Sequence, residues 1–197
     1  MFIVFEGIDG AGKTTQAFML VEGLRKLGFS AEYTAEPTYG RIGDILRLHV
    51  SRMKVRMPIY EALLFSADRF EHITRFIKPK LEKGIFVVSD RYMYSTIAYQ
   101  GAAGLDLKWL QTLNTFAPKP DLTIYLDLLS KVSLDRKKGR KSVYENMEYV
   151  KKARLIYMKL AKTEKFTIFK ADRSVEEVHS EIMAFVRQKF LKINALG

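Results

Sequence analysis

The sequence predicts an α/β domain built on a doubly wound parallel sheet, with helices on both faces. Short runs of β-branched and aromatic residues recur along the chain, each flanked by segments of helical length and period. These runs are continuously apolar, which is typical of strands covered on both sides. A length of 197 residues and a hydrophobic content of 48% fit one domain, residues 1–197, with a core of its own.

About five strands are expected. Four are the continuous apolar runs at residues 2–5, 85–88, 122–126 and 166–169. In the fifth, between residues 29 and 35, apolar and polar side chains alternate, so we expect it to be less fully covered.

Helices are expected between the strands. Apolar residues at helical spacing run from Ala17 to Leu27, and Gly28 then suits a helix end. Pro58 is expected to begin a long helix that continues through the low eighties, because proline is tolerated in the first turn. The remaining helices are expected at residues 106–117, 144–162 and 174–192.

Composition excludes several classes of protein. The absence of cysteine excludes disulfides, thiolate zinc sites and thiol nucleophiles. No apolar run approaches the roughly 20 residues of a membrane span, and the first residues lack a signal-peptide pattern. We therefore expect a soluble, unprocessed cytoplasmic protein with no membrane partner.

A net charge of +11 indicates an anionic partner, and most of the excess is local. Residues 131–165 contain twelve basic and four acidic side chains, so this segment carries +8 and the rest of the chain +3. A compact cluster suits a small, highly charged ligand better than a nucleic acid, whose binders spread charge along a face. A solvated helix face explains part of the cluster equally well.

The strongest motif follows the first strand. Residues Gly7-Ile8-Asp9-Gly10-Ala11-Gly12-Lys13-Thr14 match G-x-x-x-x-G-K-[ST], the phosphate-binding P-loop, between a strand and a helix as the motif requires. The predicted ATP-binding residues are Gly7, Ile8, Asp9, Gly10, Ala11, Gly12, Lys13, Thr14 and Thr15. Lys13 is expected to bridge the β- and γ-phosphates, and Thr14 to offer its hydroxyl to Mg²⁺. No guanine-reading Asn-Lys-x-Asp segment occurs, which disfavours a regulatory GTPase.

Asp90 and Arg91 follow a second apolar run. The carboxyl end of a buried parallel strand is where ligands bind in such sheets. Asp90 is a candidate to hold the Mg²⁺ shell through water, and Arg91 to clamp an oxyanion. The alternative is a salt bridge at the strand end.

Five segments, two of which contain the P-loop and the Asp90-Arg91 pair, are distributed along most of the chain. They are FEGIDGAGKTTQ at 5–16, EPTYGRIGDILR at 36–47, LLFSADRFEHI at 63–73, DRYMYSTIAYQGA at 90–102 and KPDLTIYLD at 119–127. Together they resemble the thymidylate kinase family, in its bacterial and archaeal form. The resemblance implies transfer of the ATP γ-phosphoryl group to dTMP with Mg²⁺, by a homodimer that has no nucleic-acid partner.

The resemblance also implies an acceptor site. Phe65 and Arg69 are four residues apart and so share a helix face. Taken alone, they would be a core residue and a surface cation, but the matching family positions stack on thymine and bond its exocyclic oxygen. By the same resemblance the substrate-binding residues are Asp9, Glu36, Phe65, Arg69, Arg91, Ser95, Thr96, Tyr99 and Gln100. Within this set, Tyr99 is expected to crowd the 2′ position, Asp9 to lie near the 3′-hydroxyl, and Arg91 to bind the acceptor phosphate.

A basic lid is expected at about residues 136–145, where five cations occur in the six positions 136–141. In the family, the arginine that stabilises the transferred phosphoryl group comes from the P-loop or from the lid. Position 10 is glycine, so Arg136 and Arg140 are the lid candidates, with a solvated basic loop as the alternative. No strong general base is needed, because a monophosphate is largely ionised at pH 7; the three histidines are therefore expected to be structural or surface residues.

Two alternatives to a dTMP kinase stay open at this point. One is a sibling kinase for another small acceptor, such as dUMP, dGMP or a non-nucleotide alcohol. The other is a nucleic-acid-binding NTPase, which only the net charge supports.

Overall fold

The computed structural model describes residues 1–52, 56–136 and 146–191. Within them, five strands form one sheet in the order β2-β3-β1-β4-β5, and every neighbouring pair is parallel. The strands are β1 (Phe2–Glu6), β2 (Ala31–Ala35), β3 (Phe86–Asp90), β4 (Leu122–Asp127) and β5 (Thr167–Lys170). This confirms the predicted fold and its five strands, including the lower burial of β2. The strand expected at 166–169 is β5, and its expected burial on both sides is wrong: Ile168 is 45% exposed, because β5 is an edge strand.

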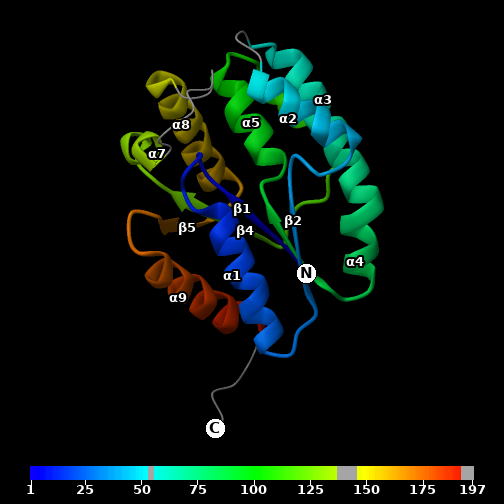
Figure 1. The fold of residues 1–197 in the computed structure, drawn as a ribbon, viewed down its shortest axis with the longest axis vertical. Coiled ribbons are helices and arrows are strands. Elements are labelled where there is room, and N and C mark those ends of the chain that lie inside the picture. Colours follow the sequence, from blue (N-terminus) through cyan, green and yellow to red (C-terminus); the bar gives the residue numbers. More distant parts are fainter. Residues whose placement is uncertain (53–55, 137–145, 192–197) are drawn as a thin grey trace.

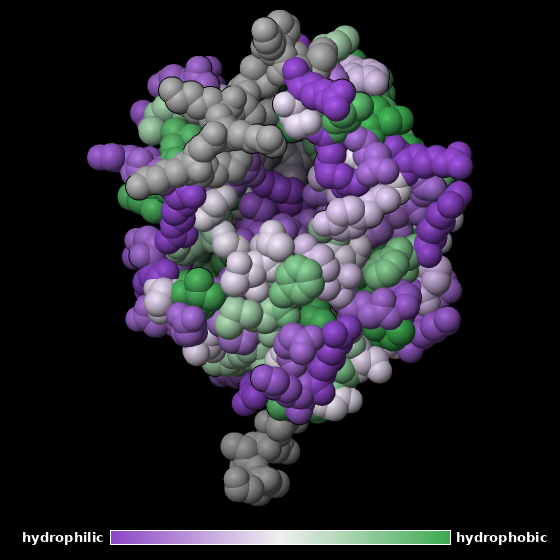
Figure 2. All heavy atoms as spheres, viewed as in Figure 1, coloured by the Kyte–Doolittle hydropathy of each residue, from purple (hydrophilic) through white to green (hydrophobic). Residues whose placement is uncertain are grey.

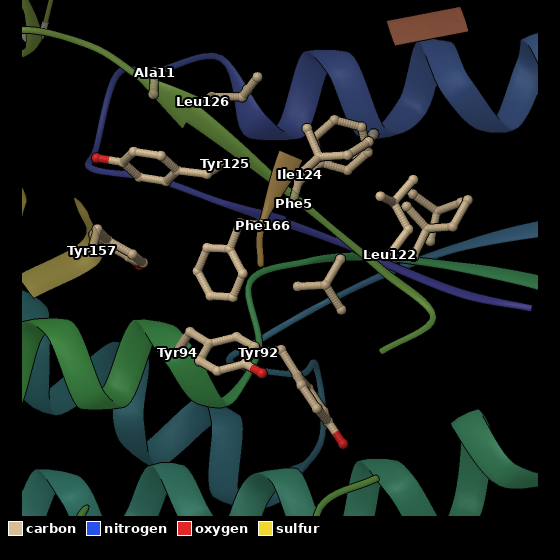
Figure 3. Close-up of a cluster of buried hydrophobic side chains, with 14 of the residues drawn as sticks. Phe5, Ala11, Tyr92, Tyr94, Leu122, Ile124, Tyr125, Leu126, Tyr157 and Phe166 are labelled. Carbon is tan, nitrogen blue, oxygen red and sulfur yellow. The ribbon is translucent and has the colours of Figure 1, made fainter. Parts of the chain in front are cut away.

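Helices cover both faces of the sheet. They are α1 (Lys13–Lys26), α2 (Arg41–Arg52), α3 (Pro58–His72), α4 (Lys78–Glu82), α5 (Met93–Ala102), α6 (Leu107–Leu113), α7 (Ser130–Arg136), α8 (Met147–Thr163) and α9 (Val175–Val186), with π-helical turns at Ile73–Ile77 and Arg187–Leu191. Figure 1 shows α1 and α9 side by side, and these two helices are in contact. Figure 3 shows α1 on one side of the strands and α5 on the other, where α5 packs against α3 and α8. In the described parts of the chain, no helix is long and apolar enough to cross a membrane.

Several predicted boundaries need correction. The helix expected at 106–117 ends at Leu113; the side chain of Asp106 caps it by accepting a hydrogen bond from the backbone N–H of Trp109 at 2.8 Å. The strand expected at 85–88 begins one residue later and extends to Asp90, so this carboxylate belongs to the strand itself. The long helix from Pro58 to Glu82 is confirmed, but its middle turn is π-helical, directly before Pro79, which has no N–H to donate.

Besides α7, two elements lie outside the predicted helix ranges, α2 and α5. Both matter for the site, because α2 packs against α3 and α5 carries four of the predicted acceptor-site residues.

The core on the α5 side of the sheet is rich in tyrosine (Figure 3). The rings of Tyr125 and Tyr157 stack with centroids 5.3 Å apart, and Tyr94 meets Phe166 edge to face at 4.6 Å. Because tyrosine combines an apolar ring with a hydroxyl, such a core can pack tightly and still serve buried polar groups. The hydroxyl of Tyr157 does so by donating to Glu6 Oε2 at 2.8 Å.

The carboxyl ends of β1, β3 and β4 meet at one edge of the sheet. Phe5 lies opposite Asp90, and Glu6 lies opposite Tyr125. The loop after β1 and the start of α5 are thereby brought together. Figure 2 shows hydrophilic side chains gathered in a hollow between these two segments.

Candidate active site

The loop between β1 and α1 has the conformation that the P-loop motif predicts. Gly7, Gly10 and Gly12 all have positive φ angles, of 149°, 75° and 88°. A Cβ on Gly7 would lie 2.7 Å from the backbone oxygen of Leu126, so glycine is needed there for close approach to β4. Gly12 precedes α1 without a side-chain cap, which leaves the N–H groups of the first helical turn facing the loop.

Lys13 is buried at the base of this loop. Its Nζ donates a hydrogen bond to the backbone oxygen of Ile8 at 2.9 Å. Burial, and the nearby charge of Arg91, lower the pKa of Lys13 to about 8, against the attraction of Asp90. An anion bound beside Lys13 would therefore stabilise its protonated form.

Thr14 and Asp90 lie together at the entrance to α1. The hydroxyl of Thr14 donates to Asp90 Oδ2, and Asp90 Oδ1 is buried with no hydrogen-bond partner among the described residues. A hydroxyl and an unsatisfied carboxylate oxygen suit Mg²⁺, which takes oxygen ligands and keeps several waters. The described residues contain no group of three or more histidine, aspartate or glutamate side chains that could hold a metal alone. A metal here would depend on substrate phosphates and water for its remaining ligands.

Arg91 does not pair with Asp90, so the strand-end salt bridge considered above is not formed between them. Its guanidinium instead pairs with Asp9 and donates to Ser95 Oγ at 3.0 Å. The same group lies 5.2 Å from the centroid of the Tyr99 ring. Arg91 itself has a positive φ of 74°, which turns its side chain from the end of β3 toward the P-loop.

Tyr99 links the P-loop to α5. Its hydroxyl accepts a hydrogen bond from the backbone N–H of Asp9 at 3.0 Å and donates to Asp9 Oδ1 at 3.2 Å. The ring is buried. The predicted residues Asp9, Arg91, Ser95 and Tyr99 are therefore in contact with one another.

Arg69 is not a surface cation, since only 1% of it is exposed. Its Nε donates to Glu36 Oε2 at 2.9 Å, and its two terminal nitrogens donate to Asn114 Oδ1 at 2.5 Å and Thr96 Oγ1 at 3.0 Å. The other oxygen of Glu36 lies 3.0 Å from Nδ1 of His72. Glu36 thus fixes Arg69 in place, and His72 is structural, as expected. Phe65 lies one turn before Arg69 on α3 and is half-buried.

Gln100 is buried on α5, facing α3. Its Nε2 donates to Glu61 Oε2 at 3.2 Å, while its Oε1 has no hydrogen-bond partner among the described residues. A buried amide with one end held and the other unsatisfied is uncommon in proteins. The unsatisfied oxygen therefore favours any group that brings it a donor.

Glu6, at the end of β1, is a site residue that the sequence analysis missed. Its Oε1 accepts from the backbone N–H groups of Tyr92 and Ser95 at 3.0 and 3.1 Å, and its Oε2 accepts from Ser95 Oγ at 2.6 Å. Burial raises the pKa of Glu6, although these hydrogen bonds oppose the shift. Tyr92, the N-cap residue of α5, makes no side-chain cap, so Glu6 caps this helix from the end of β1. The only sequence signal for this role is a charged residue directly after an apolar run.

The lid prediction is only partly within the described residues. Arg136 ends α7, and its NH1 donates to the backbone oxygen of Gly10 at 3.2 Å. Ser133 on the same helix donates to the backbone oxygen of Asp9 at 2.5 Å, so α7 lies against the P-loop. Arg140 and the lid segment 137–145 lie outside the described residues.

A parallel sheet with a P-loop and a second cationic site at the same edge defines the class of P-loop phosphotransferases. A family model described as thymidylate kinase matches residues 5–182. A probable thymidylate kinase of Pyrococcus abyssi is 46% identical over 199 residues, covering 96% of this chain and 97% of that protein. Another from Thermococcus onnurineus is 47% identical over 204 residues, covering 98% and 100%, and one from Methanocaldococcus jannaschii is 41% identical over 188 residues, covering 95% and 96%.

This chain therefore belongs to the thymidylate kinase family. The resemblance seen in the sequence is confirmed, with archaeal proteins among the relatives. The nucleic-acid-binding NTPase is not favoured.

Proposed function

We propose that this chain transfers the γ-phosphoryl group of ATP to dTMP, giving dTDP and ADP. The observation that supports the proposal is that two cationic side chains, Lys13 and Arg91, lie at one edge of the sheet. Lys13 lies in the P-loop, and Arg91 faces the same loop from the end of β3 through its ion pair with Asp9. Two nucleotides bound at these sites would bring their phosphates together there, and catalysis would rest on positioning and charge neutralisation.

The donor nucleotide is assigned to the P-loop. The N–H groups of residues 7–15 and the start of α1 would receive the phosphates, and Lys13 would neutralise them. Thr14 and Asp90 would hold Mg²⁺, which when bound neutralises charge on the phosphates. Arg136 already contacts the P-loop and is our candidate, with Arg140, for the arginine on the transferred phosphoryl group.

The acceptor is assigned to the sides of α3 and α5 that face each other. Phe65 would stack on the base, with Ser95 and Thr96 completing the wall. Thymine offers an acceptor at O4 and a donor at N3. Arg69 has five N–H donors, and four are in use, since its NH2 nitrogen also pairs with Glu36 Oε2 at 2.7 Å. One donor is left for O4, and Gln100 presents an unsatisfied oxygen to N3–H, so the pair complements that edge.

We also propose that the chain forms a homodimer through α3. Ile59, Leu63 and Phe70 lie at helical spacing on this helix and are 58, 48 and 59% exposed. The rings of Phe70 and Phe116 have centroids 5.5 Å apart, and this pair continues the apolar face of α3. An exposed apolar stripe of this size is typical of an interface between protein chains, and a second copy is its proposed occupant. A single domain with a lid at 136–145, and a cytoplasmic location, stay predictions of the same proposal.

The direct test is ADP release measured with ATP and a panel of acceptors. We expect dTMP to give the dominant rate over dUMP, dCMP, dGMP, AMP and shikimate, with no stimulation by DNA. A dominant rate with another acceptor would refute the substrate, and DNA-stimulated hydrolysis without dTDP would refute the kinase.

A further inference from the structure

The structure points to Glu61 as the residue that makes the base pocket read thymine in preference to cytosine. This inference rests on the proposed function. The two bases differ in hydrogen-bonding character at N3 and at the exocyclic position: thymine has a donor at N3 and an oxygen at position 4, and cytosine has an acceptor at N3 and an amino group at position 4. A pocket distinguishes them only if its own donors and acceptors have a fixed orientation.

The primary amide of glutamine does not have a fixed orientation by itself. Rotation by half a turn exchanges its oxygen and its NH₂ group with almost no change of shape. A free Gln100 would therefore accept from thymine N3–H or donate to cytosine N3 with similar ease. Something next to Gln100 has to choose between the two orientations.

Glu61 makes that choice. Its side chain is buried on α3, and Oε2 lies 3.2 Å from Gln100 Nε2. The other oxygen, Oε1, accepts from the backbone N–H of Met57 at 3.3 Å and lies 3.4 Å from Nε2 of His49. An ionised carboxylate only accepts hydrogen bonds, so it holds the NH₂ end of Gln100 toward itself.

The consequence is seen at the other end of the amide. Gln100 is 1% exposed, and its Oε1 is buried without a partner among the described residues. Leaving a buried acceptor unsatisfied is unfavourable, so this oxygen favours a ligand that brings a donor. Thymine N3–H supplies one, whereas cytosine N3 would place two acceptors against each other. Glu61 touches neither substrate in this account; it is a positioning residue that acts through Gln100.

The test compares dTMP with 5-methyl-dCMP, which keeps the methyl group and differs only at N3 and the exocyclic group. In Glu61→Gln the neighbour of Gln100 can itself donate or accept, so the Gln100 amide is free to reverse. We expect the ratio of kcat/KM for dTMP to kcat/KM for 5-methyl-dCMP to fall about tenfold, with the value for 5-methyl-dCMP rising. The N–H donors of Arg69 still face the amino group of 5-methyl-dCMP, which is also a donor. The preference for dTMP is therefore reduced and not inverted.

General damage to the enzyme lowers both kcat/KM values together and leaves their ratio unchanged, so the ratio separates orientation from stability. Glu164→Gln is the matched control, because Glu164 bonds Lys119 and Tyr94 away from the base pocket and its removal should leave the ratio as in the wild type. Glu61→Met, which removes the carboxylate without adding a polar group, should lower the ratio as well and serves if Glu61→Gln folds poorly. An unchanged ratio in a folded Glu61 variant overturns the inference, whereas a wild-type protein that does not phosphorylate dTMP overturns the proposed function instead.

Discussion

Raising the pH should weaken ATP binding by removing the charge of Lys13. Burial next to Arg91 lowers the pKa of this lysine to about 8, well below the ordinary value of 10.5. Bound triphosphate favours the charged form, so the pKa is higher in the complex than in the free protein. Binding therefore takes up a proton at pH values above about 8, and affinity falls as pH rises.

The size of the effect follows from the same value. With a pKa of about 8, about nine tenths of the free protein carries a charged Lys13 at pH 7 and about one tenth at pH 9. Between these pH values the dissociation constant for ATP should rise about tenfold. The apo fold responds in the opposite direction: the unfolded chain binds more protons between pH 8 and 10.5, so stability rises with pH in that window.

Isothermal titration calorimetry from pH 7 to 9.5, in buffers with different ionisation enthalpies, measures both the affinity and the proton uptake. Lys13→Met should bind ATP weakly, with an affinity that hardly changes over this range. A wild-type affinity that is flat up to pH 9.5, or binding without proton uptake near pH 8.5, would show that Lys13 is not the titrating phosphate ligand.

Three further predictions concern the cap, the lid and the dimer. Glu6→Ala removes the acceptor that serves the backbone N–H groups of Tyr92 and Ser95 and the hydroxyls of Ser95 and Tyr157. It should lower the free energy of unfolding by about 2–4 kcal/mol in urea titrations, and a loss below about 1 kcal/mol would contradict the capping role. Arg136→Ala should lower kcat by about 10² or more while changing ATP affinity little; wild-type turnover would remove Arg136 as a catalytic candidate. Leu63→Glu should convert the proposed dimer to a monomer in analytical ultracentrifugation. The control is Leu155→Glu on α8: Leu155 is also exposed, and its substitution should keep the wild-type state.

The central strands β1 and β4 could be predicted because their continuous apolar runs match their burial on both sides of the sheet. At the edge of the sheet the same pattern predicted the strand β5 but not its exposure. The same reasoning failed for α5, since Tyr99 and Gln100 are polar and yet buried, and the polar Ser95 is half-buried. They are stable inside the protein only because Glu6, Asp9 and Glu61 supply partners, and those residues come from other elements. A helix whose buried face is a binding site does not show the apolar period that identifies a helix in a sequence.

In the functional site, too, only the residues that form a local motif could be predicted. The P-loop is one continuous segment, so its glycines, Lys13 and Thr14 are visible in a pattern of eight residues. The partners of Arg69 and Gln100 lie between 27 and 45 residues away along the chain. No local pattern encodes such pairs, and only the fold brings them together. The ion pair of Glu36 with Arg69 is likewise seen only in the fold, and the substrate contact expected for Glu36 stays a prediction.

The central claim is that two nucleotides meet with their phosphates between Lys13 and Arg91. Its most direct test is a crystal structure with adenosine and thymidine joined through their 5′ oxygens by five phosphates. We expect the phosphate chain to run from the P-loop at Lys13 to the guanidinium of Arg91, with thymine between Phe65 and Gln100. A compound bound with its phosphates away from either Lys13 or Arg91 would contradict the claim.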